Sequence, residues 1–321
     1  MKHPFYSVVA EDFSAVNKLI VNNLTSNIPL VEEVSSYLIN SGGKRLRPLL
    51  VLLSAKSCGY SQSAHINLAT VIEFLHTAML LHDDVVDASE LRRGRQTVNA
   101  IWGNPASVLV GDFLHSRAFQ MMVEIGNMRV MEILSLATNV ISEGEVQQLN
   151  NIRNPDTTEA EYMEVISRKT AMLFQASSHS GAVLAGAGDK QEQALRGYGL
   201  HLGLAFQLID DVLDYEGTTL DLGKNVGDDL AEGKVTLPLI YSLQSGNSSQ
   251  RKLIKDAILS CHNDNLTEVI ETVRDAGGIE YTKSKADAEL ERAEKCLEEL
   301  PNSPYLEAMK QMVSFAVKRR Y

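Results

Sequence analysis

Residues 68–87 read LATVIEFLHTAMLLHDDVVD, and this stretch decides the fold class. Its apolar residues recur every third or fourth position: Leu68, Val71, Ile72, Leu75 and Met79. That spacing puts them on one face of an α-helix, whereas a half-buried strand would alternate apolar and polar residues. Residues 130–141 repeat the helical spacing, and no stretch combines alternation with the Asn-Gly or Asp-Gly turn of a hairpin. The sequence therefore predicts an all-α protein.

Prolines and glycines mark the breaks between the predicted helices. No proline lies between residues 49 and 104 or between 156 and 237, so long helices are allowed in both stretches. Breaks elsewhere divide the chain into roughly ten to thirteen helices. No low-complexity linker interrupts them, so we expect one domain over residues 1–321.

Composition limits the classes of function. The chain has 321 residues, 44% of them hydrophobic, and 30 Lys and Arg against 41 Asp and Glu give a formal charge of −11. This balance argues against a broad basic surface, so we expect no nucleic-acid partner. We expect a cytoplasmic protein without a transmembrane segment, because no apolar run approaches about 18 residues and residues 1–13 lack a signal-peptide pattern. Three widely spaced cysteines indicate reduced thiols: Cys58, Cys261 and Cys296.

The sequence contains two acidic clusters with the same pattern, Asp-Asp-x-x-Asp. They are the first cluster (Asp83, Asp84 and Asp87) and the second cluster (Asp210, Asp211 and Asp214). In each, the first and last aspartates share a helical face and repel each other, and a solvated face would tolerate this repulsion without explaining it. Leucine, isoleucine and valine flank both clusters, so the carboxylates face burial unless cations compensate them. Aspartate oxygens in this arrangement suit Mg²⁺, which keeps several waters and bridges substrate phosphates.

A basic segment, GGKRLRP at residues 42–48, precedes a predicted helix. Cations at a helix start oppose the helix dipole, and a bound phosphate would resolve that conflict; the alternative is a Gly-Gly helix stop followed by solvated side chains. His76 lies two helical turns before Asp83 on the same face, and Gln207 holds a similar place before the second cluster. A lone histidine of this kind is more often packed than functional. Further polar residues accompany the clusters: Arg92, Arg93, Lys169, Thr170, Lys224 and Lys234.

These residues, in this order, resemble the trans-polyprenyl diphosphate synthase family. The resemblance runs from about residue 30 to the C-terminus and rests on GGKRLRP, LLHDDVVD followed by Arg92-Arg93, Lys169-Thr170, FQLIDDVLD and GKVTLP. A single Asp-Asp-x-x-Asp motif is weakly specific, whereas both motifs together with the basic residues are highly specific. The resemblance implies the isoprenoid synthase fold, a single-domain helical bundle around a central cavity, and a homodimer.

The resemblance also implies a transferase that joins isopentenyl diphosphate to an allylic diphosphate, expected to be farnesyl diphosphate, by repeated head-to-tail (1′-4) condensation. The allylic diphosphate ionises, the double bond of isopentenyl diphosphate attacks the resulting cation, and a proton is lost. The stretches ASVLVGDF and ISEGEVQQL are similar to family members that make chains of about C40 for ubiquinone or menaquinone. Product lengths from about C30 to about C50 are the alternatives within the family.

By this resemblance both clusters are catalytic, and they hold up to three Mg²⁺ ions, with Mn²⁺ as an alternative metal, that bridge the allylic diphosphate. Four cations would clamp the same diphosphate: Arg92, Lys169, Lys224 and Lys234. Of these, Lys169 is also expected to be catalytic. Another four residues would bind isopentenyl diphosphate without metal: Lys44, Arg47, His76 and Arg93. Thr170 and Gln207 would orient the allylic substrate. No protein general base is assigned, because the released diphosphate can accept the proton.

Product length is expected to depend on the helix before the first cluster. Ala78 lies five residues before Asp83, which is about 7.5 Å along the helix axis. Short-chain members of the family usually carry a bulky aromatic residue here, so Ala78, with Met79 beside it, predicts an open tunnel and a medium or long product. Candidates for the tunnel floor are Met122, Phe119, Met121 and Leu134. Release of so apolar a product would involve transient membrane contact.

Three other functions stay open. His82-Asp83 matches the pair of a metal-dependent phosphohydrolase of the HD type, although the other histidines show no supporting arrangement and the second cluster would have no role. A non-catalytic regulatory subunit or helical scaffold would normally lack one cluster, whereas both are intact. A terpene cyclase binds one substrate and would not need GGKRLRP or Arg92-Arg93.

Overall fold

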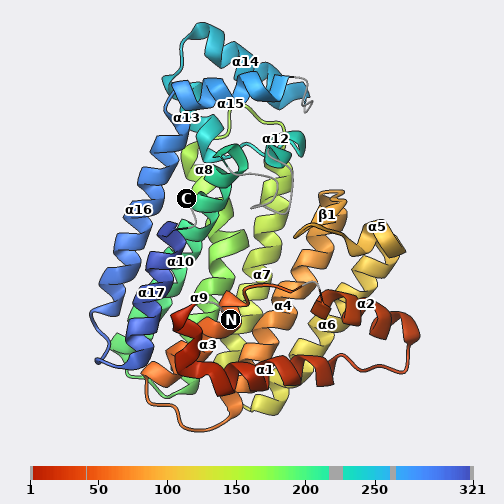
Figure 1. The fold of residues 1–321 in the computed structure, drawn as a ribbon, viewed down its shortest axis with the longest axis vertical. Coiled ribbons are helices and arrows are strands. Elements are labelled where there is room, and N and C mark those ends of the chain that lie inside the picture. Colours follow the sequence, from red (N-terminus) through yellow and green to blue (C-terminus); the bar gives the residue numbers. More distant parts are fainter. Residues whose placement is uncertain (1–2, 41, 217–226, 261–264, 319–321) are drawn as a thin grey trace. The chain divides into compact units, whose positions relative to one another are not determined.

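The computed structural model describes residues 3–318 except 41, 217–226 and 261–264. Within these ranges almost all regular structure is helical (Figure 1). The strands described are one antiparallel pair, β1 (Leu91–Arg92) and β2 (Arg95–Gln96). The all-α prediction is therefore confirmed.

Contacts within the chain divide it into two compact units, each drawn from three segments. Unit 1 comprises the residues up to Thr138 together with Leu173–Gly199 and Glu294–Met312. Unit 2 comprises Asn139–Met172, Leu200–Ala293 and the segment from Val313. The first cluster belongs to unit 1 and the second to unit 2. A single domain over residues 1–321 stays a prediction.

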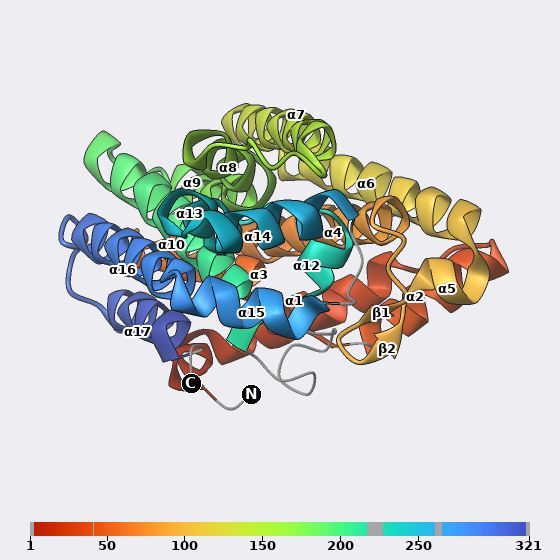
Figure 2. The ribbon, with the colours of Figure 1, turned by 90° about the horizontal axis from the view of Figure 1, so that it is seen from above.

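Unit 1 is built on α4 (Ala64–Val86), which packs against α6 (Asn104–Ile125), α3 (Leu46–Ser57) and α1 (Ala10–Asn23). Figures 1 and 2 show α4 and α6 side by side. Of the apolar face predicted for residues 68–79, Leu68, Val71, Ile72 and Leu75 are buried and Met79 is half-buried. Unit 1 also contains η1 (Pro4–Val9), α2 (Pro29–Asn40), α5 (Val98–Trp102), most of α9 (Met172–Leu184) and the first parts of α7 (Met128–Asn151) and α10 (Asp189–Glu216).

The helix α4 is long and apolar enough to cross a membrane, judged by length and composition alone. However, 56% of its most apolar stretch is buried inside the fold. A helix that is apolar on most sides and enclosed by other helices is expected at the core of a large helical protein. We therefore interpret α4 as a core helix whose C-terminal end carries the first cluster.

Unit 2 contains the C-terminal part of α10, which carries the second cluster, and the helices α8 (Glu159–Ile166) and η2 (Ser167–Ala171). α8 begins at a capping box, in which Thr158 Oγ1 accepts from the Glu161 N–H and the Glu161 carboxylate accepts from the Thr158 N–H. η2 is a π-helical turn that continues into α9. Unit 2 also contains α12 (Asp228–Ala231), α13 (Leu237–Ser245), α14 (Ser248–Ser260), α15 (Leu266–Asp275) and parts of α16 (Gly278–Leu297) and α17 (Pro304–Lys318). Figure 2 shows α14 and α15 side by side.

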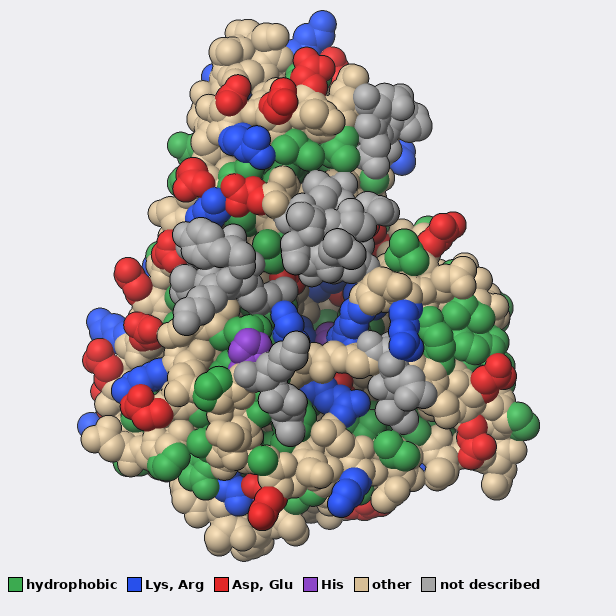
Figure 3. Space-filling view, viewed as in Figure 1, with side chains coloured by type: hydrophobic (Ala, Val, Ile, Leu, Met, Phe, Trp, Pro, Cys, Tyr) green, Lys and Arg blue, Asp and Glu red, His purple; other side chains and the backbone are tan. Residues whose placement is uncertain are grey.

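Charged side chains of both signs are interspersed over the face drawn in Figure 3. Such mixing is typical of a solvated surface, because neighbouring opposite charges limit self-repulsion. Cys58 and Cys296 are free thiols, and Cys261 lies outside the described residues.

Candidate active site

The first cluster lies at the C-terminal end of α4. Asp83 and Asp84 belong to its last turn, and Asp87 is the residue that ends it. A helix C-terminus carries partial negative charge, so carboxylates at this place need compensation. Arg92 on β1 supplies part of it, because its Nε lies 2.6 Å from Asp84 Oδ1. Burial raises the pKa of Asp84, which is 4% exposed; Arg92 opposes that shift, and Asp83 and Asp87 add to it.

The strand pair β1–β2 returns Arg92 to the end of α4. Its turn is tight, with positive φ at Arg93 (55°) and Gly94 (74°). Asn99 on α5 fixes the base of the hairpin, because its side-chain N–H groups donate to the carbonyl oxygens of Asp84 at 3.2 Å and Ser89 at 3.1 Å. The position of Arg92 therefore follows from backbone geometry as well as from its ion pair.

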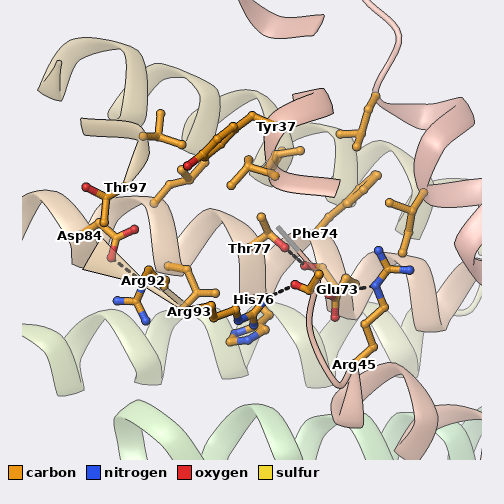
Figure 4. Close-up of a pocket in the computed structure, with 18 of the residues that line it drawn as sticks. Tyr37, Arg45, Glu73, Phe74, His76, Thr77, Asp84, Arg92, Arg93 and Thr97 are labelled. Carbon is orange, nitrogen blue, oxygen red and sulfur yellow. Dashed lines mark hydrogen bonds and ion pairs between the residues drawn. The ribbon is translucent and has the colours of Figure 1, made fainter. Parts of the chain in front are cut away.

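Arg47 and His76 meet inside unit 1 (Figure 4 shows His76). Arg47 Nη1 lies 3.1 Å from His76 Nε2, and the guanidinium lies 4.3 Å from the centroid of the Phe174 ring. Burial lowers the pKa of His76 well below its ordinary value, and the positive charges of Arg47, Arg93 and Arg92 lower it further. His76 is therefore neutral near pH 7. Because arginine only donates, Nε2 accepts from Arg47, which assigns the proton to Nδ1.

Residues 42–45 form a loop that contacts Arg93. Arg93 Nη1 donates to the Gly42 carbonyl oxygen. A Cβ at Gly43 would lie 2.6 Å from the same Nη1, so glycine is what lets Arg93 approach the loop. Lys44 is exposed at its side chain, while its carbonyl oxygen accepts from the Tyr6 hydroxyl. Unit 1 thus brings Arg93 to the loop that contains Lys44 and leads to Arg47.

A pocket in unit 1 has a polar side and an apolar side (Figure 4). The polar side includes the neutral imidazole of His76 and the charged side chains of Arg45, Glu73, Asp84, Arg92 and Arg93. The apolar lining comes from five helices of the unit and the C-cap of one of them: Ile20 on α1 and its C-cap Leu24, Leu38 on α2, Phe74, Leu80 and Leu81 on α4, Val98 on α5 and Leu114 on α6.

The residues expected to set product length lie on a neighbouring face of α4 and on α6. Ala78 and Met122 are each 1% exposed, and Met79 is half-buried. Ala78 faces α6 at Gly111, where an added Cβ would lie 3.3 Å from the Ala78 carbonyl oxygen. None of the three lines the pocket described above. Their role in product length stays a prediction.

The second cluster lies near the C-terminal end of α10 and is more deeply buried than the first. Asp211 is 1% exposed and Asp214 is fully buried, while Asp210 is half-buried. The Tyr162 hydroxyl donates to Asp211 Oδ2, and Gln207 Nε2 donates to Asp211 Oδ1 at 2.7 Å. Burial raises the pKa of Tyr162 well above its ordinary value, and the charge of Asp211 adds to the shift, so the hydroxyl remains a donor.

Two further contacts connect the second cluster to its surroundings. Thr170 Oγ1 donates to Gln207 Oε1 at 2.8 Å, so Thr170, Gln207 and Asp211 form one chain of hydrogen bonds. The Asp229 amide donates to Asp214 Oδ2 at 3.3 Å. The structure therefore brings Thr170 and Gln207 together with Asp211 of the second cluster, and their role toward the allylic substrate stays a prediction.

Lys169 lies on the π-helical turn η2 of unit 2. Its Nζ lies 2.6 Å from both Glu145 Oε2 and Gln148 Oε1. Gly144 makes room for this turn, because a Cβ there would lie 2.8 Å from Arg168 Cβ and 2.9 Å from the Lys169 nitrogen. Such turns are frequent at functional sites.

The two remaining lysines differ in what the structure shows. Lys234 Nζ lies 2.6 Å from Glu232 Oε2. Lys224 lies outside the described residues.

The structure shows what His82 does beside the first cluster. Its Nε2 lies 3.1 Å from the Val108 carbonyl oxygen and 3.5 Å from Asp112 Oδ1. A Cβ at Gly111 would lie 2.3 Å from the same nitrogen. His82 therefore packs α4 against α6, and this contact gives no support to a phosphohydrolase of the HD type.

Sequence reasoning missed two side chains, one that contacts an expected metal ligand and one that contacts the segment of the expected diphosphate ligands. Tyr162 contacts Asp211 from 49 residues away, and Glu73 forms an ion pair with Arg45. Glu73 could have been suspected from sequence, because it is a charged residue on an otherwise apolar stretch of the predicted core helix. Nothing in the local sequence marks Tyr162.

The donor set indicates which kind of metal could bind. In the described ranges, no three His, Cys, Asp or Glu side chains form a ready-made metal site. Mg²⁺ is usually held by one or two carboxylates together with waters and substrate phosphates, so it needs no such cage. At the first cluster, Asp83 and Asp87 raise the pKa of Asp84 by repulsion, which a divalent cation would relieve. The residues present fit a metal that binds jointly with a diphosphate.

Comparison with known proteins decides the family. The sequence profile of the polyprenyl synthetase family matches residues 28–275. The chain is also 47% identical over 313 residues to octaprenyl diphosphate synthase of Escherichia coli, and the match covers 97% of both chains. The chain belongs to the polyprenyl synthetase family.

Further relatives support the same family assignment. All-trans-nonaprenyl-diphosphate synthase (geranyl-diphosphate specific) of Rhodobacter capsulatus is 45% identical over 319 residues, which is 99% of this chain and 98% of that one. The crystal structure of a Caulobacter crescentus polyprenyl synthase complexed with calcium and isoprenyl diphosphate has a TM-score of 0.96 at 42% identity. That match covers 99% of this chain and 97% of the other. The fold is the all-α isoprenoid synthase fold, and the protein is a trans-prenyltransferase.

Proposed function

We propose that this polyprenyl synthetase makes octaprenyl diphosphate, a chain of about C40, by adding isopentenyl diphosphate to farnesyl diphosphate. The observation that carries the proposal is that both acidic clusters are intact and held by specific donors, in a chain that matches an octaprenyl diphosphate synthase over 97% of its length. A quinone such as ubiquinone is the expected destination of the product.

The cationic residues of unit 1 would bind isopentenyl diphosphate. Arg47, Arg93 and Lys44 supply positive charge for its diphosphate, and neutral His76 supplies an Nδ1–H donor. Arginine suits this task because its planar guanidinium donates two parallel hydrogen bonds to phosphate oxygens. The pKa of Arg93 is lowered by burial and by its arginine neighbours, and a bound diphosphate would relieve that repulsion.

The allylic diphosphate would bind to both acidic clusters through metal. We propose up to three Mg²⁺ ions, which Mn²⁺ could replace, held by Asp83, Asp84 and Asp87 and by Asp210, Asp211 and Asp214. When bound, Mg²⁺ would stabilise the negative charge that develops on the departing diphosphate. Arg92, Lys169, Lys224 and Lys234 would add cations around the same leaving group.

The chain's own residues would orient the allylic substrate and leave proton removal to the leaving group. Thr170 and Gln207, which are hydrogen-bonded to each other, would hold the allylic end of the substrate near the reacting carbon. In the described site no side chain is required as general base, since the released diphosphate lies beside the proton that is lost. Ala78 would keep the path of the growing chain open.

The proposal also covers the oligomeric state of the enzyme, its location and its contact with a membrane. We infer a homodimer in the cytoplasm, with transient contact to a membrane when the apolar product leaves. These inferences rest on the family and on the chemistry of the product.

Purified protein incubated with farnesyl diphosphate, labelled isopentenyl diphosphate and Mg²⁺ tests the proposal. The expected result is diphosphate release with a lipid product of about C40, sized by mass spectrometry. A dominant product of C30, C35, C45 or C50 would correct the chain length within the family. Phosphate release without chain growth would contradict the proposed function.

A further inference from the structure

Arg45 stands between Lys44 and Arg47 in the GGKRLRP segment, so the simplest interpretation makes it another diphosphate ligand. Its surroundings indicate a different role. Its side chain is 17% exposed and is directed at two side chains from other helices: Asn17 Oδ1 on α1 accepts from Nη1, and Glu73 Oε1 on α4 lies 3.7 Å from Nε. Figure 4 shows Arg45 paired with Glu73.

The backbone of Arg45 is unusual. It has φ 48° and ψ 46°, the left-handed region, and follows two glycines that also have positive φ, Gly42 (69°) and Gly43 (154°). A residue with a Cβ is disfavoured in that region, so the fold around it must hold it there. Arg45 is also the N-cap of α3, and its carbonyl oxygen accepts from the Leu49 N–H at 3.2 Å. The conformation of Arg45 therefore sets the direction in which α3 starts.

Neighbouring contacts fix the same loop from outside. The Tyr6 hydroxyl on η1 donates to the Lys44 carbonyl oxygen, and Arg93 donates to the Gly42 carbonyl oxygen. Arg47 is the second residue of α3, so the direction of α3 determines where its guanidinium meets His76. A small rotation at Arg45 would move both Lys44 and Arg47.

We propose that Arg45 is a positioning residue: Asn17 and Glu73 hold its guanidinium so that its left-handed backbone presents Lys44 and Arg47 to the diphosphate of isopentenyl diphosphate. The proposal rests on the binding site proposed above. In this proposal Arg45 stabilises the conformation of the loop, whereas Lys44 and Arg47 bind the substrate.

Replacement of Arg45 by glycine and by alanine separates the two roles. Glycine adopts the left-handed region freely, whereas alanine does not. Without the anchored guanidinium, Arg45→Ala is expected to raise the KM for isopentenyl diphosphate about tenfold, whereas Arg45→Gly restores it to within about threefold of the native value. If Arg45 bound the substrate directly, both variants would lose the same contact, and an equal rise in KM overturns the proposal.

Asn17 gives an independent test, and it is a cleaner probe than Glu73, whose charge also acts on Arg47 and Arg93. Asn17→Ala is expected to raise the KM for isopentenyl diphosphate severalfold in the native background and not at all in the Arg45→Gly background. Equal effects in both backgrounds overturn the proposal. The KM for farnesyl diphosphate should stay within about twofold in every variant, since the loop is assigned to the other substrate. If Arg45→Ala does not fold, Asn17→Ala in the native and Arg45→Gly backgrounds still tests the proposal.

Lys44→Ala and Arg47→Ala distinguish failure of the anchor from failure of the binding site. Both variants are expected to raise the KM for isopentenyl diphosphate without rescue by any change at Arg45. If they leave that KM unchanged, the proposed binding site is wrong. If they raise it while glycine and alanine at Arg45 behave alike, the site stands and the anchor is wrong.

Discussion

The two acidic clusters have the same sequence pattern but different surroundings. In the first, buried Asp84 is paired with the guanidinium of Arg92, which is itself 36% exposed. In the second, Asp211 accepts hydrogen bonds from a buried hydroxyl and an amide, those of Tyr162 and Gln207. The first arrangement compensates charge with charge, whereas these contacts of the second fix the carboxylate through neutral donors.

This difference suggests a division of labour. A partly exposed cation near the first cluster would attract a diphosphate from solvent, and salt would screen that attraction. The Tyr162 hydroxyl and the Gln207 amide hold the geometry of Asp211 and themselves carry no charge. One motif can therefore serve both binding and alignment, depending on what its helix packs against.

The largest expected effect is loss of a carboxylate from either cluster. Asp84→Asn and Asp211→Asn should each lower kcat/KM for farnesyl diphosphate by about 10²–10³-fold, because each would remove a proposed carboxylate ligand of the metal that neutralises the leaving group. Steady-state kinetics over a range of Mg²⁺ concentrations checks this, with thermal unfolding as a control for folding. A cluster whose variant keeps activity within tenfold of native has no part in the reaction.

The second cluster is expected to depend on Tyr162. Tyr162→Phe leaves the buried Asp211 carboxylate without one donor, so kcat should fall by about tenfold to a hundredfold. Tyr281→Phe is the matched control in the same unit, because it removes a hydroxyl that lies 2.8 Å from Glu159 Oε2. The control should keep native activity. Equal losses of kcat in both variants would show that Tyr162 contributes to stability and has no specific role at Asp211.

Product length should respond to the helix of the first cluster and not to that of the second. Ala78 and Ala205 each lie five residues before the first aspartate of their cluster, and both are buried. Ala78→Tyr is expected to shorten the product from about C40 to about C20, while Ala205→Tyr should lower activity or stability, by about 1–3 kcal/mol from overpacking, without changing product size. Mass spectrometry measures the product length of both variants. An unchanged product length in Ala78→Tyr would refute a tunnel for the growing chain at this position.

The smallest expected effect concerns pH and the cationic surroundings of His76. Its pKa in the folded protein lies well below 6.5, so below that pH the unfolded chain takes up a proton that the folded chain does not. The free energy of unfolding should therefore fall by about 1 kcal/mol between pH 6.5 and 5.5 from this residue alone. Denaturant unfolding of native protein and His76→Gln at both pH values measures it. The same pH dependence in both proteins would show that His76 is not held neutral.

Local patterns made the helices and both clusters predictable. The spacing of Leu68, Ile72 and Leu75 is visible within a few turns of one helix, and the aspartates are adjacent in sequence. The resemblance grouped Thr170 with Gln207, and the structure places them 2.8 Å apart.

Contacts between distant segments could not be predicted in the same way. Tyr162 on α8 donates to Asp211 on α10 from 49 residues away, and no periodicity within either helix encodes that pairing. Arg45 looks like one more cation in a basic segment, and its left-handed backbone becomes visible only with Asn17 and Glu73 around it. The π-helical turn under Lys169 likewise depends on Gly144 from another helix.

The proposed function requires that both clusters act on one allylic diphosphate. A crystal structure of the protein with Mn²⁺ and an unreactive farnesyl thiodiphosphate would show whether they do, because anomalous scattering locates the metal ions. We expect Mn²⁺ at Asp83, Asp84 or Asp87 and at Asp210, Asp211 or Asp214, all coordinated to the same diphosphate. Metal at one cluster only, or two clusters that bind separate ligands, would contradict it.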